Sequence, residues 1–114
     1  MDAYIIGEML FEGLTVYTPW MPRQGNSGVF AVEILGISGV TMTVTLETKK
    51  HADTDEAANI SEPGTISSIT TTGVKTSAVL SNFKDVFRLK ISTGATPSLD
   101  WVFLRILAPS WQAN

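Results

Sequence analysis

The chain has 114 residues, of which 44% are hydrophobic, so a single domain with one core is expected over residues 1–114. The absence of cysteine excludes disulfides, thiolate metal sites and cysteine nucleophiles. The net charge of −3 and the scattered positions of the eight Lys and Arg residues argue against nucleic-acid binding, which needs a basic surface to neutralise phosphates.

The N-terminal segment, residues 1–11, shows no targeting signal. Asp2 stands where a signal peptide needs a basic region, and Glu8 interrupts the apolar run. No stretch of the chain approaches the roughly 20 consecutive apolar residues that span a bilayer. We therefore expect no signal peptide, no transmembrane segment and no membrane partner. Residues 5–11 are predicted to form either a strand or a terminal arm.

Three segments alternate apolar and polar side chains, a period of two that is typical of a β-strand with one buried face. They are residues 28–37, 40–48 and 85–92. The predicted inward-facing side chains are Phe30, Val32, Ile34, Val40, Met42, Val44, Leu46, Phe87, Leu89 and Ile91. A short connection that contains glycine, residues 37–39, predicts a hairpin that pairs the first segment with the second.

The other segments give weaker signals. Further strands are predicted at residues 14–18, 65–71 and 76–80. Residues 49–60, which include several alanines and acids, are predicted to contain the one short helix of the chain. Turns rich in proline, glycine and small polar residues separate the strands at 18–28, 62–64 and 92–98.

The last predicted strand, residues 99–107, differs from the others because both of its faces are largely apolar. Val102, Leu104 and Ile106 lie on one face, and Trp101, Phe103, Arg105 and Leu107 lie on the other. Such a strand is either covered on both sides within the monomer or meets another subunit. We predict a subunit interface at Trp101, Phe103, Leu107 and Trp111. Trp111 belongs to the tail at 108–114, a second candidate arm.

Seven or eight short strands without alternating helices indicate an all-β domain. The predicted architecture is an antiparallel β-sandwich with jelly-roll or Greek-key connections. A small closed barrel is the alternative, since strand patterns alone do not separate the two.

The only histidine, His51, lies in an acidic loop, where Asp53, Asp55 and Glu56 are candidate calcium ligands. An EF-hand loop that began at Asp53 would need glycine at its sixth position and glutamate at its twelfth, and neither is present. Zinc would need further His or Cys ligands. We therefore favour a solvated loop and expect no metal or other cofactor.

The sequence also lacks the usual arrangements for catalysis. No Gly-x-Ser-x-Gly motif occurs, and Gly36-Ile37-Ser38-Gly39 is one residue short of it. Glu33 and Glu47 lie outward on strands that are predicted to adjoin, but surface charges on a wet sheet face explain them as well as a glycosidase pair would. No phosphate-binding glycine loop is present. We expect a protein that is not an enzyme.

Exposed aromatic residues offer one route to a ligand. The aromatic residues that could stack on sugar rings, as in carbohydrate-binding sandwiches, are Tyr17, Trp20, Trp101 and Trp111. Trp20 is the best single candidate, because it lies in a proline-rich loop beside Arg23. Alternatively, Trp20 covers one end of the sandwich and Trp101 and Trp111 pack in the core or at a subunit contact.

Three stretches carry a resemblance to known proteins: residues 23–26 leading into 30–35, residues 44–48, and residues 101–105. With its strands placed in this way, the chain resembles the small β-sandwich structural proteins of tailed bacteriophages, namely decoration, minor capsid and head–tail proteins. The resemblance covers most of the chain in style and implies no catalytic residues.

The resulting expectation is a non-enzymatic structural protein that associates with copies of itself, and with other virion proteins if it is part of a virion. Its expected location is the virion, with the cytoplasm as the alternative. A carbohydrate-binding β-sandwich module is the alternative function.

Overall fold

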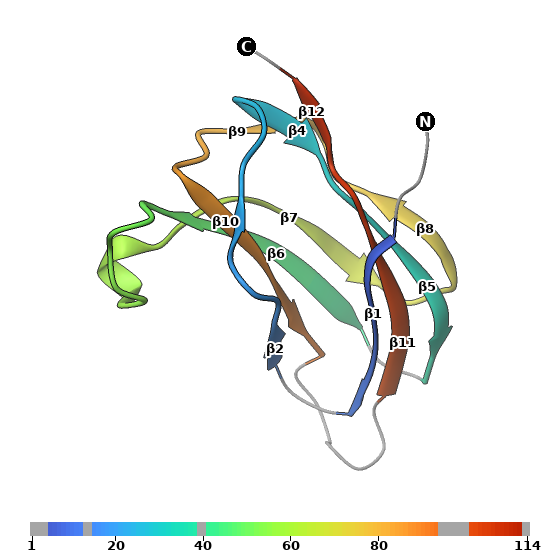
Figure 1. The fold of residues 1–114 in the computed structure, drawn as a ribbon. Helices are drawn as coiled ribbons and strands as arrows, with labels where there is room; N and C mark the ends of the chain where they lie inside the picture. Colours follow the sequence, from blue (N-terminus) through green and yellow to red (C-terminus); the bar gives the residue numbers. More distant parts are fainter. Residues whose placement is uncertain (1–4, 13–14, 39–40, 94–100, 113–114) are drawn as a thin grey trace.

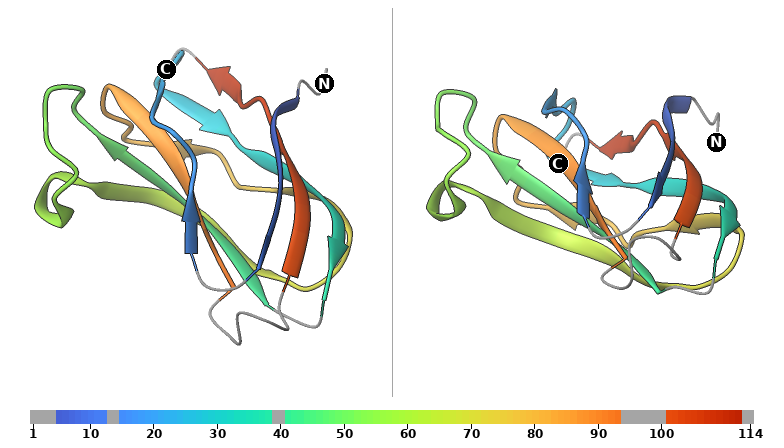
Figure 2. Two further views of the ribbon diagram at one scale, coloured as in Figure 1. Left: turned by 60° about the horizontal axis from the view of Figure 1, so that its bottom comes forward. Right: turned by 90° about the horizontal axis from the view of Figure 1, so that it is seen from below.

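The computed structural model describes residues 5–12, 15–38, 41–93 and 101–112, and these form an antiparallel β-sandwich. Sheet 1 has the strand order β1 (Ile5–Glu12), β11 (Trp101–Leu107), β5 (Ala31–Ile37) and β8 (Gly73–Thr76). Sheet 2 has the order β2 (Thr15–Tyr17), β10 (Val86–Ser92), β6 (Met42–Lys49) and β7 (Ser61–Ile69), and β3 (Met21–Pro22) also pairs with β10. Figures 1 and 2 show the two sheets as separate layers.

The connections between these strands are those of a jelly roll. Among the eight strands of the two four-stranded orders, only β6 and β7 are both consecutive along the chain and paired in one sheet. Every other connection crosses to the opposite layer, which is the two-Greek-key arrangement of a jelly roll. The structure therefore confirms the predicted sandwich and selects the jelly roll among the predicted connections.

The predicted hairpin between residues 28–37 and 40–48 is wrong. β5 pairs with β11 and β8, whereas β6 pairs with β10 and β7 in the other layer. A short connection only requires that the ends of two strands lie close together. Strand ends can be close in the two facing sheets of a sandwich as well as within one sheet. The first segment is also interrupted, because Phe30 separates β4 (Ser27–Val29) from β5.

The predicted helix at residues 49–60 is reduced to a single turn. β6 continues to Lys49, and only η1 (Ala57–Asn59) is helical, as a 3₁₀ turn. The intervening loop is closed by local bonds, among them one from the backbone N–H of Asp53 to the carbonyl of Lys50. Within the described residues, the structure contains no helix with the length and apolar character needed to cross a bilayer.

The core lies between the two sheets and uses the predicted inward faces. Its fully buried side chains include Val32, Ile34, Met42, Val44, Leu46, Ile91, Val102 and Leu104. Val40 lies outside the described residues. Burial of one such side chain contributes about 1.5–3 kcal/mol, so the alternating strands provide most of the driving force for folding.

A third, smaller sheet closes one end of the sandwich. It has the order β12 (Ser110–Gln112), β4 and β9 (Leu80–Ser81). β12 brings Trp111 edge-on against the rings of Phe30, Phe83 and Phe87, at centroid distances of 5.3–5.5 Å. The indole of Trp111, which the sequence assigned to a subunit interface, is thus held against the chain's own core.

Candidate functional site

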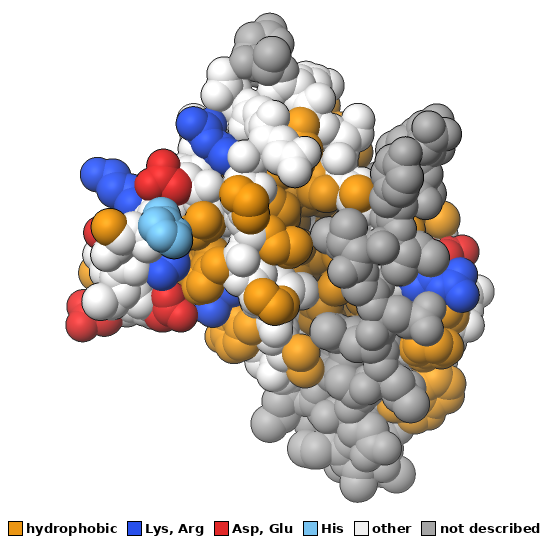
Figure 3. Space-filling view, in the orientation of Figure 1, with side chains coloured by type: hydrophobic (Ala, Val, Ile, Leu, Met, Phe, Trp, Pro, Cys, Tyr) orange, Lys and Arg blue, Asp and Glu red, His pale blue; other side chains and the backbone are white. Residues whose placement is uncertain are grey.

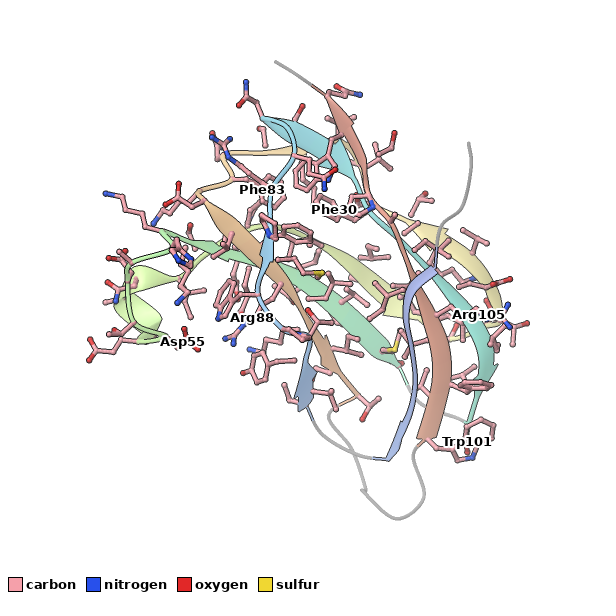
Figure 4. The ribbon with its side chains drawn as sticks, viewed as in Figure 1. Phe30, Asp55, Phe83, Arg88, Trp101 and Arg105 are labelled. Atoms are coloured by element: carbon pink, nitrogen blue, oxygen red, sulfur yellow. The ribbon has the colours of Figure 1, made fainter. Side chains whose placement is uncertain are left out.

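The main concentration of polar contacts lies on the outer face of sheet 2, next to the loop of residues 50–60. We call it the Arg88 cluster, and it consists of Tyr17, Trp20, Glu47, Lys49, Asp55 and Arg88. Figure 4 shows Arg88 and Asp55 together on the left of the molecule, and Figure 3 shows charged side chains of both signs gathered there. The side chains come from β2, β6, β10, the segment after β2 and the loop.

Arg88 occupies the centre because the register of β10 on β6 places it opposite Glu47. Its Nε donates a hydrogen bond to Glu47 Oε1 at 2.8 Å. The guanidinium carbon lies 4.2 Å from the ring centroid of Tyr17 and 4.3 Å from that of Trp20. Two rings and a carboxylate therefore hold the guanidinium in one place, where cation–π attraction adds to the charge pairing.

The loop is attached to this centre through Asp55. Lys49 Nζ lies 2.8 Å from Asp55 Oδ1 and also donates to the carbonyl of Asp53 at 2.7 Å. Trp20 Nε1 donates to the same Asp55 oxygen at 3.2 Å, and Arg88 Nη1 lies 3.9 Å from Oδ2. The pKa of Asp55 is lowered below its ordinary value of 3.8. The hydrogen bond from Lys49 has the larger effect, and that from Trp20 has the next largest.

The charged members of the cluster that lie on β6 are buried. Glu47 and Lys49 are almost inaccessible to solvent, with Thr48 between them on the inward face. Thr48 Oγ1 donates to the carbonyl of Val86 and accepts from the N–H of Lys84. A buried charge is tolerated only when it is paired and hydrogen-bonded. Glu47 meets this requirement through Arg88, and Lys49 meets it through Asp55.

A cavity of about 440 Å³ opens beside the cluster, within the size range of small-molecule sites. Its walls combine the ring of Tyr17 and the apolar side chain of Ile60 with charged side chains, namely those of Glu47, Asp55, Glu62, Arg88 and Lys90. Tyr17 is 47% exposed, and the guanidinium of Arg88 covers part of its ring.

Of the three sequence-predicted ligand residues, Tyr17 and Trp20 lie together against Arg88, and Arg23 lies elsewhere. Tyr17 lines the cavity, and Trp20 is part of the cluster, but its indole N–H is already bound to Asp55. Arg23 lies apart, where its Nη1 donates to Asn26 Oδ1 and its backbone N–H donates to the carbonyl of Asp85.

The calcium candidates Asp53, Asp55 and Glu56 do not converge. Nowhere in residues 5–12, 15–38, 41–93 and 101–112 does the structure group three or more His, Asp or Glu side chains in a way that could hold a metal ion. Asp55 is instead bound to Lys49 and Trp20. His51 contributes its backbone N–H, which donates to Asp85 Oδ2 at 3.0 Å.

Glu33 and Glu47 are not neighbours, contrary to the sequence-based prediction. They lie in different sheets because β5 and β6 do not pair. Glu33 Oε1 lies 3.5 Å from Arg105 Nη1, whereas Glu47 is buried against Arg88 rather than exposed on a wet face.

Two of the four predicted interface residues, Trp101 and Phe103, lie on the outer face of sheet 1. Trp101 is 40% exposed, Phe103 is half-buried, and the Arg105–Glu33 pair borders them on the next row. The indole of Trp101 lies across Gly36, where a Cβ atom would come within 3.0 Å of the ring. Leu107, which the sequence grouped with them, is only 6% exposed and belongs to the interior.

The sequence does not single out Arg88, Lys90, Ile60 or Glu62 as site residues, and it offers Glu47 only as a partner of Glu33. Their shared location depends on the pairing of β6 with β10 and on the path of the loop, and neither leaves a local pattern in the sequence.

No family model, curated protein or solved structure matches this chain.

Proposed function

We propose that the protein is a non-enzymatic structural component that associates with copies of itself through the outer face of sheet 1. The observation that carries the proposal is the exposure of Trp101 beside Phe103 on β11, an inner strand of its sheet. Exposed apolar patches often mark interaction sites, and Trp is among the residues that contribute most at interfaces.

The composition around these aromatic residues supports the same proposal. The Arg105–Glu33 pair lies beside them, and Val74, the pairing partner of Glu33 on β8, is 53% exposed. An apolar centre with charged groups at its margin is the usual composition of a protein–protein interface. Figure 4 shows Trp101 and Arg105 at the right-hand edge of the molecule.

We further propose that the assembly is a virion and that the protein is a capsid, decoration or head–tail component. The jelly roll is a recurrent fold of viral capsid domains, and the sequence resembles small phage sandwich proteins. The same fold also occurs in lectins and cupins, so the fold supports this assignment without deciding it. Neighbouring genes that encode capsid, portal and tail proteins are expected, and a purely metabolic neighbourhood would contradict the virion assignment.

The mass in solution tests self-association. At micromolar to 100 μM concentrations, sedimentation velocity is expected to show a multiple of the chain mass. Replacement of Trp101 by Ala should weaken association by at least about 30-fold, as loss of an interface residue worth about 2 kcal/mol would. Val79→Ala is the matched control, because Val79 is 55% exposed but lies outside sheet 1. A strictly monomeric wild-type chain would exclude self-association.

A further inference from the structure

We infer that the cavity beside the Arg88 cluster is a binding site for a neutral saccharide. This inference concerns the outer face of sheet 2 and does not depend on the proposed self-association through sheet 1. It revises the sugar site expected from Tyr17, Trp20 and Arg23, because only Tyr17 of these three lines the cavity.

The cavity combines the two kinds of surface that a sugar ring needs. Tyr17 offers a half-exposed aromatic ring, and Ile60 adds apolar surface from the loop. The C–H face of a sugar ring packs on such groups. Arg88 and Lys90 supply hydrogen-bond donors, while Glu62, which is exposed, supplies acceptors. Each sugar hydroxyl both donates and accepts, so one ligand can use both sets.

The charged side chains that line the cavity disfavour anionic and apolar ligands. Three of the lining side chains are acidic (Glu47, Asp55 and Glu62) and two are basic. In addition, Glu47 and Asp55 already engage the guanidinium of Arg88. A phosphate, a sulfate or a nucleic acid would meet more carboxylates than free cations, and an apolar ligand would leave the charged groups desolvated. A neutral polyhydroxyl ligand meets neither obstacle.

The site is held in place before any ligand arrives. Glu47 and the two rings fix Arg88, and the register of β2 on β10 places Tyr17 directly beside Lys90. The bonds of Asp55 to Lys49 and Trp20 hold the loop that carries Ile60 against the sheet. Groups that are already ordered lose little entropy on binding, which favours affinity for a small ligand.

Titration of the isotope-labelled protein with glucose, galactose, N-acetylglucosamine and maltose, observed by NMR, tests this inference. At least one sugar is expected to shift the amide signals of residues 17, 60–62 and 88–90 in a saturable way. The probes for the competing class are inorganic phosphate and glucuronic acid. Saturable shifts at these residues with phosphate or glucuronic acid alone would overturn the neutral-saccharide assignment.

Variants locate the site. Tyr17→Ala should weaken binding at least tenfold and Glu62→Gln should weaken it measurably, while Tyr17→Phe, which keeps the ring, should retain most of the affinity. Trp101→Ala is the matched control on the other sheet and should leave binding unchanged. The thermal unfolding of each variant checks that it is folded. If no neutral saccharide binds at tens of millimolar, or if folded Tyr17→Ala binds as well as wild type, the inference is wrong.

Discussion

At the residue scale, Arg88 and Glu47 form an ion pair that is largely buried. Their side chains are 14% and 8% exposed, so both charges are largely removed from water. The mutual attraction and the two aromatic contacts offset the cost of that desolvation only while both partners are present.

Arg88→Met is therefore expected to destabilise the protein by about 3–5 kcal/mol, because it leaves the Glu47 carboxylate buried without its partner. Urea unfolding of the variant measures this loss. The double variant Arg88→Met with Glu47→Leu should regain most of the stability, since two apolar side chains of similar size leave no unpaired charge. A double variant that is less stable than Arg88→Met would contradict this account of the pair.

Asp55 gives the site a dependence on pH. Folding lowers its pKa, chiefly through the hydrogen bond from Lys49, so the ionised carboxylate is favoured in the folded state. The resulting stabilisation is complete above the ordinary value of 3.8 and is lost as the pH falls through the lower folded pKa. The attachment of the loop should therefore persist at neutral pH and weaken only in acid.

Asp55→Asn should be less stable than wild type at neutral pH, and the difference should shrink as the pH falls below 3.8. Thermal unfolding of both proteins across the acidic range measures the change. Glu56→Gln, in the same exposed loop, serves as the control and should leave stability at neutral pH unchanged. A wild-type advantage over Asp55→Asn that stays constant down to pH 2 would rule out this role of the carboxylate.

At the scale of single elements, β12 covers one end of the sandwich. It pairs with β4, and the N–H of Asn26 donates to the carbonyl of Gln112 at 2.9 Å. The approach is so close that a Cβ atom on Gly25 would lie 2.5 Å from that carbonyl oxygen. Residues near the end of the described chain thus complete the aromatic core.

Trp111→Ala should destabilise the protein by about 3 kcal/mol, the lower end of the range for large aromatic truncations, because the indole is only partly buried. Chemical unfolding measures the loss, and Gln112→Ala, an exposed change on the same strand, is the control. A loss in the free energy of unfolding below about 0.5 kcal/mol, the usual size for a surface substitution, would show that Trp111 and β12 add little to the stability of the core.

At the scale of the whole molecule, the jelly roll places the two proposed surfaces on different sheets. Figure 4 shows Trp101 and Arg105 on one side and Arg88 and Asp55 on the other. Each sheet has one face in the shared core and the other outside, so a protein of this design can assemble through one sheet while it presents the other.

The two surfaces should therefore respond to substitution independently. Trp101→Ala should lower the association constant without changing saccharide affinity, and Tyr17→Ala should do the reverse. The double variant should show the sum of the two effects, because distant sites without shared partners are additive. Sedimentation and NMR titration of the same three variants test this, and a joint loss of both properties in a folded single variant would refute it.

The alternating segments predicted the all-β class and the inward side chains because the period of two reports on which face of a strand is buried. Met42, Val44 and Leu46 are as buried as that period requires. Tyr17, one of the ligand candidates from the sequence, lines the cavity, and its role in binding stays a prediction.

Strand partners were decided only by the tertiary structure. β5 and β6 follow one another in the chain but lie in different sheets. The pairing of Arg88 with Glu47 and the packing of Trp111 on Phe30 join segments that are distant in the chain. Periodicity records whether a side chain meets the core and not which strand lies beside it. The sequence by itself thus determined what is buried along each strand, and tertiary packing decided which outward side chains meet to form a site.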